Sequence, residues 1–206
     1  MTNLTKTLTF ALLMAMATPI NAQTTEGETA TAEETAAADA LALSMGSEDV
    51  AVGDVYVTTE HGDWEVRCIK TEGDNDPCQL YQLLHTVSES GDKSPVAEIN
   101  IFALGEEGGP AAGATIITPL ETLLTQELAM SVDGGKAKKY PFSWCSQIGC
   151  FSRVGFSAAD VAAFKKGVNA TLTIVPVAAA DQRVNLTVSL KGFTAGFTDL
   201  QERNGN

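Results

Sequence analysis

A histidine, several acids and two cysteines lie close together in residues 61–79, which read HGDWEVRCIKTEGDNDPCQ. These residue types can ligate a metal ion, carry thiol redox chemistry or form a structural disulfide. Zinc sites favour cysteines about two to four residues apart, and redox thiol pairs favour Cys-x-x-Cys at the start of a helix. Cys68 and Cys78 have nine residues between them, and neither begins a helical pattern. The spacing favours a structural disulfide.

The chain has four cysteines, Cys68, Cys78, Cys145 and Cys150. In an oxidising compartment they predict two disulfides, and sequence alone leaves three connectivities open. We favour the local pairs Cys68–Cys78 and Cys145–Cys150, because turn-forming residues fill 72–77. The crossed pairing, Cys68–Cys150 with Cys78–Cys145, stays an alternative, as does metal or redox use. Each local bridge predicts roughly 2–3 kcal/mol of stabilisation. We expect no bound metal and no cofactor.

His61 and Asp63 are the candidates for acid–base chemistry. Residues two apart on a strand point to the same face, so Asp63 is a candidate to orient His61 as a base. No nucleophile accompanies them, and the chain lacks Gly-x-Ser-x-Gly, His-Glu-x-x-His and phosphate-cradling loop patterns. We therefore predict a protein that is not an enzyme. A ligand-binding or catalytic site near His61 and Asp63 is the alternative.

Lys136, Lys138, Lys139 and Tyr140 form the one basic concentration in the sequence. One interpretation is a patch that recognises a partner. The other is a solvated hairpin edge whose lysines block edge-to-edge aggregation.

The elements that must position these residues follow a signal peptide and a leader. An apolar run at 8–17 after Lys6, with a small residue at Ala22, predicts a signal peptide over residues 1–22. Residues 23–53 are rich in Ala, Thr and Glu and predict a disordered acidic leader. Residues 54–203 are enough for one domain with its own core. The net charge of −13 argues against nucleic-acid partners and anionic membrane surfaces, and no later run is long enough to span a membrane.

Short runs with alternating apolar residues, separated by turn residues, dominate the predicted domain. A capping pattern at Ser157 and Asp160 predicts a helix that ends at Gly167, and one or two helical turns are expected near 193–200. We expect Phe142 and Trp144 to pack in the core or against a disulfide. These features predict an antiparallel β-sandwich with one or two short helices. The predicted strands are 64–69, 79–87, 96–104, 114–118, 128–132, 137–142, 150–156, 170–177 and 184–190.

Several segments in order resemble the invasion-associated locus B family of bacterial secreted proteins. They are HGDWEVRC with a downstream PCQ, MSVDGGK, PFSWCSQIGCFSRVGF, a helix with a glycine and an alternating strand, and VSLKGFTAGFTDL. Together they cover about 54–200. The cysteines and Trp64 match the family pattern, and we expect Trp64 to pack inward.

The resemblance implies an immunoglobulin-like sandwich in the periplasm or secreted, with outer-membrane association as a further option, in a family widespread in alphaproteobacteria. Some relatives are linked to entry into host cells. The expected function is therefore non-catalytic binding of a protein partner in the envelope or on a host surface. An accessory subunit that stabilises an envelope or inner-membrane complex is the alternative. No catalytic residues carry over from the family.

Overall fold

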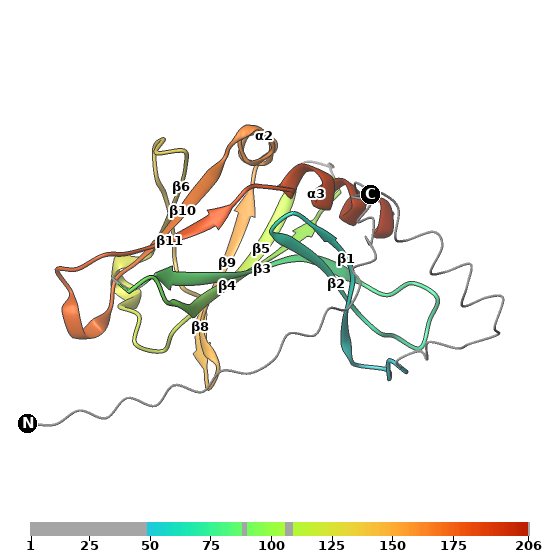
Figure 1. Ribbon diagram of the computed structural model, residues 1–206, viewed down its shortest axis with the longest axis horizontal. Coiled ribbons are helices and arrows are strands. Elements are labelled where there is room, and N and C mark those ends of the chain that lie inside the picture. The colour runs from blue at the N-terminus through green and yellow to red at the C-terminus, as the bar shows by residue number, and fades with distance from the viewer. Residues whose placement is uncertain (1–48, 88–89, 106–108, 206) are drawn as a thin grey trace, which may run out of the picture. The chain divides into compact units, whose positions relative to one another are not determined.

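The computed structural model describes residues 49–87, 90–105 and 109–205, so the predictions for residues 1–22 and for most of the leader lie outside these ranges. Within them the strands form two antiparallel sheets (Figure 1). The seven-stranded sheet has the order β1 (Val55–His61), β2 (Trp64–Ile69), β3 (Cys78–Val87), β4 (Lys93–Ala103), β5 (Ala112–Thr118), β9 (Gly149–Phe156) and β8 (Trp144–Ser146). The four-stranded sheet has the order β11 (Val184–Ser189), β10 (Asn169–Ile174), β6 (Leu128–Val132) and β7 (Lys138–Tyr140).

In the described part of the chain two α-helices accompany the sheets, α2 (Ala158–Lys166) and α3 (Phe193–Arg203), together with short 3-10 turns η1 (Leu124–Gln126) and η2 (Val177–Ala179). Helix α2 begins at a capping box, in which Ser157 and Asp160 bond to each other's backbone N–H. Helix α3 lies against β1 to β4, and Figure 1 shows it beside β1 and β2. No helix in the described part of the chain has the length and apolar character that crossing a membrane requires.

The core lies between the inward faces of the two sheets and the helices. Strand β5 illustrates the pattern, since its residues alternate between buried and half-buried along its whole length. Trp64 is buried, as predicted, and its ring meets Phe193 edge-on at 5.5 Å. The Phe193 ring also meets the Phe164 ring edge-on, and Phe164 meets Phe156 in the same way. These aromatic contacts connect β2, α3, α2 and β9.

All nine predicted strands overlap observed ones, and the capped helix is present. The mostly antiparallel β fold with two helices and two disulfides confirms the predicted fold class, and the paired sheets are consistent with an immunoglobulin-like sandwich. Strands β1 and β8 were not predicted. Helix α3 is also longer than the one or two turns expected, because Phe193, Phe197 and Leu200 bury one face of it over eleven residues.

Candidate functional site

The turn at residues 61–64 packs directly on the turn that follows β11. Asp63 N–H donates to the carbonyl of Lys191 at 3.1 Å. Gly62 and Gly192 both have positive φ, at 62° and 87°. A Cβ on Gly62 would lie 2.6 Å from the Lys191 oxygen, and a Cβ on Gly192 would lie 1.9 Å from the His61 oxygen. Glycine is therefore needed on both sides of this contact.

Ser189, the last residue of β11, is the polar centre of this contact. Its carbonyl accepts from the indole Nε1 of Trp64 at 2.8 Å and from Nε2 of Gln82 at 3.1 Å. Its hydroxyl donates to Oδ2 of Asp63 at 2.6 Å. Asp63 therefore ties the β1–β2 turn to the end of β11, which joins the two sheets.

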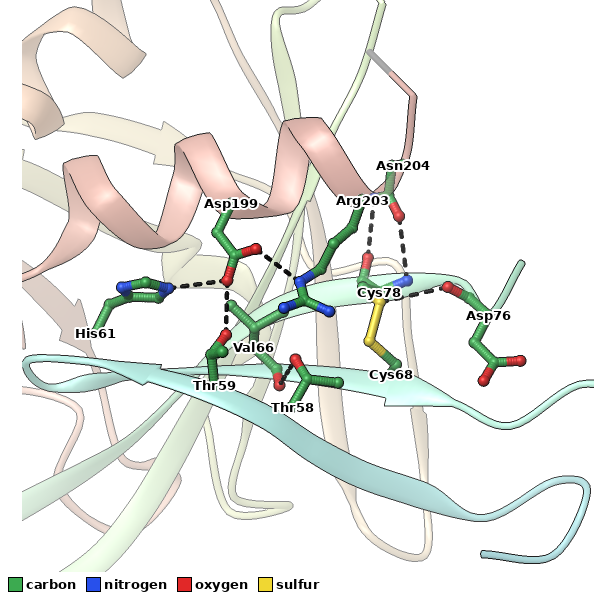
Figure 2. Close-up of polar contacts among 10 residues, drawn as sticks. All are labelled: Thr58, Thr59, His61, Val66, Cys68, Asp76, Cys78, Asp199, Arg203 and Asn204. Carbon is green, nitrogen blue, oxygen red and sulfur yellow. Dashed lines mark hydrogen bonds and ion pairs between the residues drawn. A yellow bond between two sulfur atoms is a disulfide. The ribbon is translucent and has the colours of Figure 1, made fainter. Parts of the chain in front are cut away.

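His61 meets a different acid from the one that the sequence suggested. Its Nε2 lies 2.9 Å from Oδ2 of Asp199 on α3 (Figure 2). Asp63 bonds instead to Ser189. The Thr59 hydroxyl donates to the same Asp199 oxygen at 2.6 Å, and Arg203 Nε donates to Oδ1 at 2.7 Å. The His61 and Asp199 side chains are 25% and 19% exposed. The candidate pairing of Asp63 with His61 is therefore not made, because the turn directs the two side chains to separate elements.

The electrostatics of Asp199 follow from these contacts. Burial alone would raise the pKa of Asp199, but hydrogen bonds from Thr59, His61 and Arg203 outweigh it and lower the pKa from 3.8 to about 2. The carboxylate is ionised at neutral pH and holds β1 against α3. A hollow of about 170 Å³ beside the turn is lined by Glu60, Gly62, Asp63, Trp64 and Glu65, and His61 does not line it. The arrangement positions one end of the sheet, and the side-chain hydrogen bond of His61 is with the Asp199 carboxylate and not with a hydroxyl or a thiol.

The disulfides are Cys68–Cys78 and Cys145–Cys150, so the local pairing is confirmed over the crossed one. Each joins residues directly opposite each other on adjacent antiparallel strands, β2 with β3 and β8 with β9. Cys68, Cys78 and Cys150 are buried, whereas Cys145 is exposed.

The buried bridge is also held from Asn204, the residue that follows α3. The side chain of Asn204 donates to the Cys78 carbonyl at 3.1 Å and accepts from the Cys78 N–H at 3.3 Å (Figure 2). All cysteines are thus in disulfides. Across the described ranges, no group of three or more His, Cys, Asp or Glu side chains is arranged to hold a metal ion.

The basic cluster does not form one continuous patch. Lys138 makes an ion pair with Asp160 of α2. Tyr140 packs edge-on against Phe156 at 6.3 Å, and burial raises its pKa. Lys136 and Lys139 are exposed, although Lys136 lines a hollow of about 190 Å³ between this hairpin and α2 together with Lys138 and Tyr140. Part of the cluster is structural, and partner recognition by the rest stays a prediction.

The outer face of the seven-stranded sheet carries a feature that the sequence reasoning missed. Five residues are paired in succession across β3, β4, β5, β9 and β8, so their side chains form one row on this face. The row consists of Leu83, Glu98, Ile117, Phe151 and Trp144.

Two hydrophobic residues of this row are exposed. Leu83 is 41% exposed and Trp144 46%, and Ile148, in the β8–β9 turn, is 75% exposed. Trp144 stacks on Phe151 at 4.9 Å on the outer face, so of the two aromatics that precede Cys145 only Phe142 packs against the core.

A hollow of about 230 Å³ opens beside this row. The outer-face side chains Leu83, Val96, Glu98 and Ile117 line it together with Pro119 and Ile148. An alternation signal in the sequence would have placed Leu83, Glu98 and Ile117 on one face. Only the strand register, which sequence does not give, brings them side by side.

A family model described as Invasion associated locus B (IalB) protein matches residues 64–201. The Invasion protein B homologs of Brucella abortus strain 2308 and Brucella abortus biovar 1 strain 9-941 are each 29% identical over 139 residues, which is 68% of this chain and 76% of theirs. The crystal structure of invasion associated protein B from Bartonella henselae matches with a TM-score of 0.60 and 22% identity, over 73% of this chain and 98% of that one.

The solved structure is similar in fold, and the family model extends over more than half of the chain, including the disulfides, the outer row and most of α3. This protein belongs to the invasion-associated locus B family.

Proposed function

We propose that this protein is a non-catalytic binding module of the cell envelope, and that a protein partner binds the outer face of its seven-stranded sheet. The observation that carries this proposal is the exposure of Leu83 and Ile148 at one hollow on that face, with the exposed Trp144 farther along the same row. Neighbouring exposed apolar side chains typically mark sites of interaction.

The polar contacts of the 61–64 turn support a non-catalytic role. Asp63 is engaged with Ser189, and His61 with Asp199. Each of these contacts joins two elements of the fold.

Two disulfides support an oxidising compartment. With the predicted signal peptide, they favour a periplasmic or secreted protein. The names of the Brucella and Bartonella relatives refer to invasion. For this chain we propose a role in host-cell interaction, with the partner an envelope protein or a host-surface protein.

Photo-crosslinking in the native cell tests this function. Leu83 is replaced by benzoylphenylalanine in the full-length chain, and cells are irradiated alone and in contact with host cells. We expect one discrete adduct, because Leu83 is exposed and lines the hollow at which the proposed contact forms. Ile148→Asp in the same chain should reduce the adduct by at least about fivefold, since a buried charge costs more than 1 kcal/mol at an interface.

Val177 supplies the matched control, because it is 57% exposed on η2, outside the outer row. Benzoylphenylalanine at Val177 should give no adduct, and Val177→Asp should leave the Leu83 adduct unchanged. Equal adducts from the two positions, or none from Leu83, would contradict the proposal. The adduct's identity separates an inner-membrane complex from a host-surface protein.

A further inference from the structure

A single carboxylate lies within the apolar row. Glu98 on β4 is directly opposite Leu83 on β3 and Ile117 on β5, and all three line the hollow. Glu98 is half-buried. Its Oε2 accepts from the Tyr81 hydroxyl at 3.3 Å, and its Oε1 accepts from Nδ2 of Asn100 at 3.4 Å. These two donors orient the carboxylate and do not neutralise it.

One cation on this face, Arg67 on β2, is engaged elsewhere. Arg67 makes an ion pair with Glu65 at 2.7 Å, and its guanidinium lies 3.3 Å from the centre of the Tyr81 ring. Among the described residues, no ion pair includes Glu98. The hollow therefore has an oriented negative charge surrounded by exposed apolar side chains, in a chain of net charge −13.

This combination selects for a ligand of defined chemistry. The charge of Glu98 and of the whole chain repels anions such as phosphate groups and acidic lipid surfaces. The hollow, about 230 Å³, lies below the roughly 300–1,000 Å³ typical of sites for whole small molecules. It suits one long side chain whose aliphatic stem packs on apolar walls while its cationic head reaches a carboxylate.

We propose that the hollow binds one Lys or Arg side chain of the partner, presented between apolar residues that cover Leu83, Ile117 and Ile148. This inference rests on the proposed function and names the chemistry of the partner's contact segment. Glu98 supplies the ion pair, and Tyr81 and Asn100 keep its carboxylate directed within the face.

Peptide titration of the full chain tests the charge preference. The probes are three capped pentapeptides that differ at the centre, Ser-Leu-Arg-Leu-Ser, Ser-Leu-Gln-Leu-Ser and Ser-Leu-Glu-Leu-Ser. Trp144 reports binding by fluorescence, because the only other tryptophan, Trp64, is buried. We expect the Arg peptide to bind at least about tenfold more tightly than the Gln peptide, and the Glu peptide more weakly than both.

In the Glu98→Gln variant the dissociation constants of the Arg and Gln peptides should differ by no more than about twofold, because the substitution keeps the shape of the side chain and removes its charge. Glu72→Gln, in the exposed β2–β3 loop, removes one charge from the same chain and should preserve the preference. Circular dichroism checks that both variants fold. If one does not, the comparison of the three peptides on the unaltered chain still tests the proposal.

The inference is wrong if the unaltered chain binds the Arg and Gln peptides equally or binds neither at millimolar concentration. It is also wrong if Glu98→Gln keeps the preference. In each case, a Leu83 adduct that Ile148→Asp abolishes would leave the proposed function standing. If the Leu83 adduct were also absent or unaffected by Ile148→Asp, both the proposed function and this inference would be wrong.

Discussion

The side chain of Gln82, on β3, exchanges two hydrogen bonds with the backbone of Ser189, at the end of β11. Ser189 N–H donates to Oε1 at 2.8 Å, and Nε2 donates to the Ser189 carbonyl at 3.1 Å. Nε2 also donates to the carbonyl of Asp63 at 3.0 Å. The buried side-chain amide of Gln82 thus satisfies the backbone N–H and C=O of Ser189, as the backbone of a neighbouring strand would. It connects the two sheets and the 61–64 turn.

Gln82→Met should destabilise the fold by about 2–3 kcal/mol, because the Ser189 N–H and the Asp63 carbonyl lose their side-chain partner. Urea unfolding followed by circular dichroism measures this loss. Gln79→Met is the matched control, since Gln79 is half-buried on the opposite face of the same strand. A similar cost for the two variants would mean that the Gln82 bonds do not connect the sheets.

Gly192→Ala should destabilise the fold by on the order of 3–5 kcal/mol or prevent folding, because its Cβ would meet the His61 carbonyl. Gly134→Ala is matched in backbone conformation, at φ 71° against 87°, but a Cβ there has open space around it. It should cost only about 1–2 kcal/mol for the left-handed backbone. Thermal unfolding measures the loss of stability in each variant. Equal losses would show that the close contact between the 61–64 turn and the turn after β11 does not matter for stability.

Local signals predicted much of this fold. Alternation located the nine strands, and the pattern at Ser157 and Asp160 located α2, because both depend on neighbours within a few residues. Turn residues between Cys68 and Cys78 indicated their pairing for the same reason. The inward position of Trp64 also followed from the strand pattern and the family resemblance.

The rest depends on contacts distant in the sequence. β1 is an edge strand with a register shift between Val57 and Thr59, and its exposed valines break the alternation that marks a half-buried strand. His61 and Asp199 are 138 positions apart in the sequence, so no local pattern could indicate their contact. The outer row likewise requires the register of five strands. The expectation that Trp144 packs in the core or against a disulfide therefore did not foresee its exposed place in that row.

The two disulfides should differ in their rates of reduction. Thiol–disulfide exchange requires a thiolate to reach one sulfur, and Cys145 is exposed whereas Cys68 and Cys78 are buried. Under graded dithiothreitol in native buffer, alkylation and peptide mass analysis should find Cys145 and Cys150 labelled first, by at least about tenfold in rate. In urea the rates should converge, because burial no longer protects Cys68–Cys78. Equal native rates would contradict this order.

The contribution of Asp199 to stability should depend on pH. Its pKa is about 2 in the folded protein and 3.8 ordinarily, so folding favours the ionised carboxylate. That stabilisation is complete above about pH 5 and is lost as the pH falls through 4 toward 2.

Asp199→Asn removes this titration, and its deficit in unfolding free energy relative to the unaltered chain should be constant from about pH 5 to 7 and shrink steadily below pH 4. Chemical unfolding at a series of pH values measures the difference. Asp74→Asn, in the exposed β2–β3 loop, should give a difference near zero throughout. A deficit for Asp199→Asn that stays the same from pH 7 to pH 2 would show that the carboxylate's charge does not hold β1 to α3, leaving only the shape of the side chain to do so.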